Sequence, residues 1–126
     1  MKRKRILCAL LFVVLVPFTS GCGKKADTSK SVDQIKTEVQ RMSLGDLEAN
    51  AKVYATEIVS KKSEVDKAAD KMKSISPTEL FGDKAKGLKD EISKLQSDLS
   101  ALTQRYEVYA QKYSQMGGDV SKVKIS

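Results

Sequence analysis

The chain has 126 residues, with two prolines, no tryptophan and no histidine, and 31% of its residues are charged. This length leaves room for one small domain and excludes a multidomain enzyme. Many Lys, Glu, Ser, Ala and Leu residues and few aromatic ones predict an all-α protein rather than a sheet protein.

The formal charge of +7 is concentrated at the N-terminus. The basic run from Lys2 to Arg5 carries four of the positive charges, so the rest of the chain has 19 basic and 16 acidic residues, a balance of +3. Those residues alternate in sign along the chain, as on the surface of a solvated helix. We therefore expect no nucleic-acid partner.

Residues 1–21 have the three-part layout of a secretory signal peptide. The basic start is followed by an apolar run from Ile6 to Val16, then by Pro17 and mostly small residues up to Gly21. The apolar run would form a helix of about 16 Å, whereas the hydrocarbon core of a bilayer is about 30 Å thick. A transmembrane anchor is therefore the weaker interpretation.

The segment Phe18-Thr19-Ser20-Gly21-Cys22 resembles the lipobox of bacterial lipoproteins. In that class the cysteine sulfur receives a diacylglyceryl group, a peptidase cuts before the cysteine, and the new amine is commonly acylated, for instance with palmitate. The resemblance covers residues 1–22 only, and Thr19 stands where the class usually has Leu. It implies that Cys22 is lipidated; ordinary secretion with Cys22 near the new N-terminus is the alternative.

The lipobox resemblance implies a cell-envelope protein that is held in a membrane by lipid. Each buried CH₂ of several acyl chains contributes about 0.8 kcal/mol, so such an anchor is permanent. In this class, Gly23 in place of an Asp favours the outer membrane, facing the periplasm, if the cell has two membranes. Cys8 leaves with the signal peptide and lipid occupies Cys22, so no thiol remains for a disulfide or a metal.

The mature chain is expected to begin with a flexible tether over residues 22–31, because this stretch has no apolar face. Its expected reach is roughly 15 to 18 Å. A short helix is predicted over residues 32–42, where apolar residues keep helical spacing. Ser43, followed three positions later by Asp46, predicts a break and the cap of a new helix.

Two long apolar stripes, each alternating in steps of four and three residues, predict an antiparallel two-helix coiled-coil hairpin within residues 32–116. Its helices are expected over residues 43–75 and 83–116, with a small helical corner at 76–82 and a disordered tail at 117–126. The stripes consist of Leu47, Ala51, Tyr54, Ile58, Lys61, Val65, Ala68, Met72 and Ile75, and of Leu88, Ile92, Leu95, Leu99, Leu102, Tyr106, Tyr109, Tyr113 and Met116.

Two registers, one heptad apart, keep these stripes facing each other. In the tightest turn the charged residues beside the seam meet like charges, whereas the slipped register brings Glu57 near Arg105 and Tyr54 beside Tyr106. At about 0.3 to 0.5 kcal/mol per exposed pair, charge favours the slipped register without dictating it. A lone hairpin is marginally stable, so either the short helix folds back onto it or two hairpins pair into a helical bundle.

The residue types of common catalytic sites are missing from the mature chain. It contains no histidine, no free thiol and no glycine-rich phosphate loop after a strand. We therefore expect no enzyme, no cofactor, no metal site and no small-molecule substrate.

The remaining candidates for a functional site are residues of a partner surface. Tyrosine is enriched at interface hot spots, so Tyr106, Tyr109 and Tyr113 are candidates, although tyrosines at seam spacing more often belong to a core. Lys61 is the polar residue of the first stripe. It either selects a register or a partner, or extends its amine from the seam to water.

These features predict a non-enzymatic envelope lipoprotein whose hairpin is a scaffold or docking element for another envelope component, with self-association left open. The alternative is a periplasmic, chaperone-like module that binds clients between its helices. That alternative requires the apolar seam to open.

Overall fold

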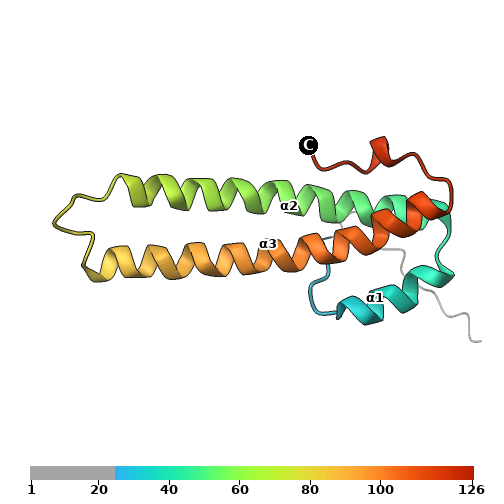
Figure 1. Ribbon diagram of the computed structural model, residues 1–126, viewed down its shortest axis with the longest axis horizontal. Coiled ribbons are helices and arrows are strands. Elements are labelled where there is room, and N and C mark those ends of the chain that lie inside the picture. Colours follow the sequence, from blue (N-terminus) through green and yellow to red (C-terminus); the bar gives the residue numbers. More distant parts are fainter. Residues whose placement is uncertain (1–24) are drawn as a thin grey trace, which may run out of the picture.

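The computed structural model describes residues 25–126, which form a long helical hairpin with a short helix beside one end (Figure 1). Helix α1 spans Val32–Glu38 and continues into a 3-10 turn, η1, at Val39–Arg41. Helix α2 spans Leu44–Lys73, helix α3 spans Asp83–Gln115, and a 3-10 turn, η2, spans Val120–Lys122. The described residues contain no β-strand. The predicted all-α hairpin is thus confirmed.

Helices α2 and α3 lie antiparallel, side by side along most of their length (Figure 1). The ring of Tyr54 stacks on that of Tyr109, with 5.4 Å between the ring centroids. In the tightest turn Tyr54 would face Leu99, so the stack agrees with the slipped register. The ring stacked on Tyr54 is that of the tyrosine which follows Tyr106 in the predicted stripe.

Serine caps define where α1 and α2 begin. Ser31 Oγ accepts a hydrogen bond from the Gln34 backbone N–H at 3.2 Å, and the Gln34 side chain accepts one from the Ser31 N–H at 2.8 Å. Ser43 and Asp46 form the same reciprocal pair at the start of α2. The predicted cap at Ser43 is confirmed, and each such cap typically stabilises a helix by about 1 kcal/mol.

The corner at residues 76–82 consists of turns and is not a helix, which corrects the sequence-based prediction. The Glu79 N–H donates to Ser76 O at 2.9 Å and the Gly82 N–H donates to Glu79 O at 3.0 Å. These two bonds close single turns that do not propagate. Gly82 then adopts an extended conformation and is the N-cap of α3, so Asp83 lies in the first helical turn, where its charge complements the helix dipole.

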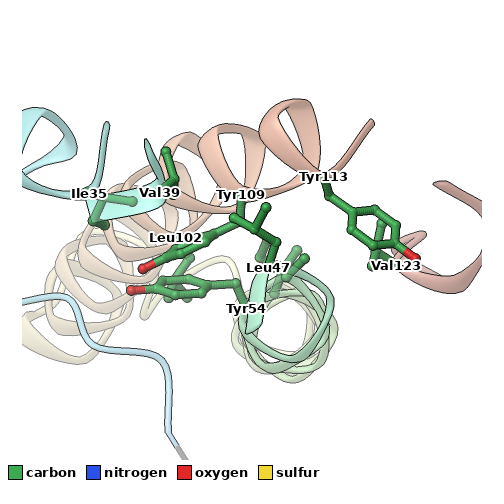
Figure 2. Close-up of a cluster of buried hydrophobic side chains, with 10 residues drawn as sticks. Ile35, Val39, Leu47, Tyr54, Leu102, Tyr109, Tyr113 and Val123 are labelled. Atoms are coloured by element: carbon green, nitrogen blue, oxygen red, sulfur yellow. The ribbon is translucent and has the colours of Figure 1, made fainter. Parts of the chain in front are cut away.

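The hydrophobic core lies at one end of the hairpin, which we call the base (residues 25–58 and 102–126; Figure 2). We call the rest of the hairpin, residues 59–101, the arm. The core combines residues from α1, η1, α2, α3 and the C-terminal tail: Ile35, Val39, Leu47, Ala51, Tyr54, Ile58, Leu102, Tyr109, Tyr113 and Val123.

Both ends of the described chain pack on the base, which corrects two expectations. In the N-terminal segment (residues 25–31), expected to be part of a flexible tether, Ala26 packs against the core. In the tail (residues 117–126), expected to be disordered, Val123 is 1% exposed and Ile125 is partly buried. The tail lies beside α2 and α1 beside α3, on opposite sides of the hairpin (Figure 1). Each covers apolar surface that a two-helix seam leaves open.

Candidate functional site

The predicted tyrosine stripe holds the base together and is not an exposed surface. Tyr109 and Tyr113 lie one turn apart on α3 and are both buried. Figure 2 shows their rings pointing in different directions, Tyr109 over Tyr54 and Tyr113 toward Val123 of the tail. The core interpretation of these two residues is therefore confirmed. The alternative of a partner surface is wrong for them, because their rings pack within the chain.

Hydroxyl groups of the same stripe bind the tail and α2. The partly buried Tyr106 donates its O–H to Val123 O at 2.8 Å. Tyr113 donates its O–H to Glu48 Oε2 at 2.9 Å. The hydrogen bond with Lys52, and to a smaller extent the one with Tyr113, holds the pKa of the Glu48 carboxyl below its usual value. The stripe thus joins α3 to both of its neighbours, and a buried tyrosine hydroxyl usually needs such a partner.

Lys61 lies in the seam beyond the core and is engaged locally. Its side chain is 18% exposed, and Nζ lies 2.8 Å from Glu64 Oε2. The hydrogen bond with Glu64 raises the pKa of the Lys61 amine, and Asp98 and Glu57 act in the same direction. The structure therefore shows an amine directed to the rim of the seam, paired one turn along its own helix.

Arg105 is the key polar residue that the sequence-based interpretation assigned differently. Its guanidinium was expected near Glu57, yet within the described residues it forms no ion pair with that carboxylate. It donates instead to three backbone carbonyl oxygens: those of Lys30 at 3.0 Å, Thr28 at 3.0 Å and Ala101 at 2.8 Å. The five N–H donors of arginine can serve several carbonyls at once, which a lysine amine at this position would do poorly.

The N-terminal segment is thus clamped at several points along its length. Tyr54 donates its O–H to Asp27 O, and Arg105 binds the carbonyls of Thr28 and Lys30. The Lys30 amine also forms a 2.8 Å ion pair with Glu38 of α1. We refer to these contacts as the clamp. The clamp cannot be predicted from a sequence pattern, because its acceptors are main-chain oxygens, which every residue has.

Replacing Arg105 with Gln is expected to release the N-terminal segment while the hairpin stays helical. Two of its three charge-assisted bonds hold the segment, those to Thr28 and Lys30. At about 1 kcal/mol net for a typical bond, their loss is sufficient to open a short segment. Amide hydrogen exchange should rise in residues 25–31 and stay unchanged around Leu47. The matched control is Gln104→Ala at the exposed neighbouring position, for which unchanged exchange is expected. Equal protection of the segment in both variants would contradict the clamp.

The buried tyrosines make the protein sensitive to alkaline pH. Burial raises the pKa of Tyr54 from its ordinary 10.0 to about 12, and burial also raises the pKa of Tyr106, Tyr109 and Tyr113. Between these two pH values the unfolded chain loses protons that folded Tyr54 keeps. The free energy of unfolding must therefore fall as the pH rises through this window.

The measurement is a tyrosinate absorbance titration combined with denaturant unfolding at each pH. We expect stability to be insensitive to tyrosine ionisation below pH 10.0 and to decline toward about 12. Tyr54→Phe should decline less steeply, since it removes one of the shifted groups. Titration of all four tyrosines at their ordinary pKa would disprove this account.

Exposed apolar side chains lie on both parts of the hairpin, with Leu44, Met116 and Val120 on the base, and the most exposed of them lies on the arm. Phe81, at the corner, is 97% exposed, and its neighbour Leu80 is also exposed. Val59 is exposed on α2. Along the seam of the arm, apolar residues from both helices are only partly buried: Val65, Met72, Leu88, Ile92, Leu95 and Leu99. The small or corner residues Ala68, Ile75 and Ala85 are buried there. Among the described elements, only α2 and α3 form the seam of the outer part of the arm. Nearer the base, Lys25 and Ala26 lie beside Lys61 and Asp98.

The described residues also lack two kinds of site. Among residues 25–126, no helix combines the length and the apolar character needed to cross a bilayer. The same residues hold no group of three or more His, Cys, Asp or Glu side chains arranged for a metal ion. Cys22, the predicted lipidation site, lies outside the described residues.

No protein-family model matches this chain, and no curated protein or solved structure is significantly similar to it. Its function is therefore inferred from the surfaces and contacts of its own residues.

Proposed function

We propose that this chain is a non-enzymatic, lipid-anchored lipoprotein of the cell envelope whose arm docks onto another envelope component. The observation that carries the proposal is the contrast between the two halves of the hairpin. The base buries its seam under α1 and the tail, whereas the arm leaves Leu88, Ile92 and Leu95 partly exposed and ends in the exposed Phe81. Contiguous exposed apolar surface is typical of interaction sites.

The arm is suited to docking because it projects from a base that is fixed independently of it. The core cluster and the clamp involve residues 26–58 and 99–125, so contacts made on the outer part of the arm leave them undisturbed. An aromatic side chain at a fixed corner can enter a partner pocket at a low entropic cost. We therefore expect Phe81 to contribute directly to binding.

Photocrosslinking in intact envelopes tests the docking role. A photoreactive phenylalanine analogue at Phe81 should capture a specific partner, and the same analogue at Ser114, an exposed position on the base, should not. Equal capture at both positions, or capture of abundant bystanders only, would refute the proposal. Phe81→Ala should weaken capture from Val65 while changing the free energy of unfolding by less than about 0.5 kcal/mol, because the ring is 97% exposed.

Lipid anchoring has a separate test. Cys22→Ala should abolish metabolic acyl labelling and leave uncleaved precursor, whereas Ser20→Ala, which keeps a small residue before the cut, should be processed. Normal processing of Cys22→Ala would refute the anchor. The lipobox resemblance supports an outer-membrane location facing the periplasm, and fractionation of the labelled protein tests it.

A second candidate function is chaperone-like binding of unfolded or lipidic clients. The open seam favours this function. Among the described elements, α2 and α3 alone hold the outer part of the arm together, and its opening would expose Leu88, Ile92 and Leu95. The purified domain should then bind a hydrophobic dye and suppress aggregation of a denatured client. Failure in both assays would exclude this function and leave docking.

A further inference from the structure

The clamp fixes where the predicted lipid anchor joins the folded domain. Lys25 lies beside residues of both long helices, including Glu57 and Lys61 of α2 and Asp98 of α3. Ala26 packs against the core from the same side. Helix α2 spans Leu44–Lys73, so Glu57 and Lys61 lie close to its midpoint. The chain therefore leaves the domain from the side of the hairpin, well away from either end.

Covalent geometry limits how far this exit point can lie from Cys22. Lys25 is three residues after Cys22, and each residue of a fully extended chain advances it by at most about 3.3 to 3.6 Å. The Lys25 Cα is therefore within about 11 Å of the Cys22 Cα in any conformation of the intervening residues. The expected tether of roughly 15 to 18 Å does not exist as free chain, since residues 25–31 are bound to the base.

We propose that the hairpin lies flat along the membrane surface, with its α1 side toward the lipid headgroups. This proposal rests on the proposed lipidation of Cys22 and adds the orientation of the domain. A 30-residue helix such as α2 is about 45 Å long, so the hairpin extends about 22 Å to each side of its attachment point. If it stood upright, one half would have to enter the bilayer.

The permitted tilt follows from these two lengths. An end that lies about 22 Å from the attachment point can move only about 11 Å toward the membrane before reaching it, which limits the tilt to about 30° from the membrane plane. Entry into the hydrocarbon is prohibitive for either end, since charged residues such as Lys112 and Asp83 lie there. The long axis is thus held within about 30° of the membrane plane.

The side of the hairpin that faces the membrane follows from the path of the chain. The N-terminal segment leads directly into α1, and both lie on the side opposite the tail (Figure 1). An open groove of about 590 Å³ runs along α1 next to Lys30, lined by Met42, Arg41 and Thr37 among others. A thioether beside a guanidinium suits the headgroup region, where aliphatic stems are buried and charges stay hydrated. The tail then faces away from the membrane.

Energy transfer from labels at the two ends of the hairpin measures the orientation. The full-length lipidated protein would carry a single added cysteine, Thr78→Cys at the corner or Gln115→Cys at the base, in vesicles of phosphatidylethanolamine and phosphatidylglycerol with acceptor dyes on the headgroups. A flat hairpin predicts similar transfer efficiencies for both labels. In an upright hairpin the two labels would differ in height above the membrane by about 45 Å. Transfer from the higher label would then be far weaker than from the lower one.

A lengthened tether is the matched control because it leaves the fold unchanged. Inserting about eight Gly and Ser residues between Gly23 and Lys24 adds roughly 15 Å of typical reach and should make the two transfer efficiencies diverge or fall. The double variant Tyr54→Phe/Arg105→Gln, which releases the clamp, should do the same. Unequal transfer in the unmodified tether, with the protein floating with the vesicles, would overturn the orientation alone. Failure to float would overturn lipid anchoring and the orientation together.

Discussion

Replacing Gly118 with alanine is expected to destabilise the protein by about 1 to 3 kcal/mol and to detach the tail from the base. A Cβ at this position would lie 2.5 Å from Cε2 and Cζ of Tyr113, a distance at which carbon atoms clash. The Tyr113 ring is 1% exposed and its hydroxyl is bonded to Glu48, so it has no space into which to move. Gly117 before it has φ of +83°, so the two glycines let the chain turn closely around the ring.

Gly87→Ala is the matched control for this prediction. Gly87 lies within α3, and no other side chain or distant backbone atom comes within 4 Å of an added Cβ. The same substitution should therefore stabilise the protein by about 0.5 to 1 kcal/mol through its higher helix propensity. Denaturant unfolding monitored by circular dichroism measures both changes. A shift of both variants in the same direction would refute the packing of Gly118 against Tyr113.

Replacing Leu102 with alanine is expected to have the largest effect, a loss of about 2 to 5 kcal/mol. Leu102 is 2% exposed and contributes to the core cluster between α2 and α3. Domains of this size have a total stability of about 5 to 15 kcal/mol, so this one change can remove a large part of it. The same truncation at Leu95, one heptad away on the arm, should cost much less, because that side chain is already partly in contact with water.

The comparison of these two leucines tests the distinction between base and arm. Native-state hydrogen exchange should give the amides near Leu102 protection close to the global free energy of unfolding, and those near Leu95 less protection. If both truncations lower the free energy of unfolding by the same amount, the seam of the arm is as well buried as the base and is not an open surface. Binding of the envelope partner proposed above should increase protection of the arm selectively.

The hairpin was predictable from sequence because its determinants are periodic or local. Apolar residues at steps of three and four placed Leu47, Ile58 and Leu102 in one seam, and the structure buries all three. The Ser43 cap depends on a residue three positions away and was equally visible. The corner was predicted incorrectly because Ser76 and Glu79 form the bonds of a turn, a pattern that a helix cap shares.

The contacts that join distant segments were not predictable. Arg105 binds the carbonyls of residues more than seventy positions away, and main-chain acceptors carry no residue signature. Val123 lies in a short, mostly polar tail, and its burial depends on a space between α2 and the tyrosines that exists only after the hairpin has formed. The burial of Tyr109 and Tyr113, by contrast, agrees with the core interpretation that their seam spacing favoured over a partner surface.

The core is assembled from the two ends of the chain, and this determines when it can form. Ile35 and Val123 belong to one cluster although both long helices, α2 and α3, separate them in sequence. A chain that emerges from its N-terminus can form single helices early, but contacts of high sequence separation must wait for the last segment. Until Val123 has emerged, the base lacks part of its cover and the chain stays easy to unfold. If the chain is exported as a lipoprotein, as proposed above, the base gains its full stability only after the tail has passed the translocation channel.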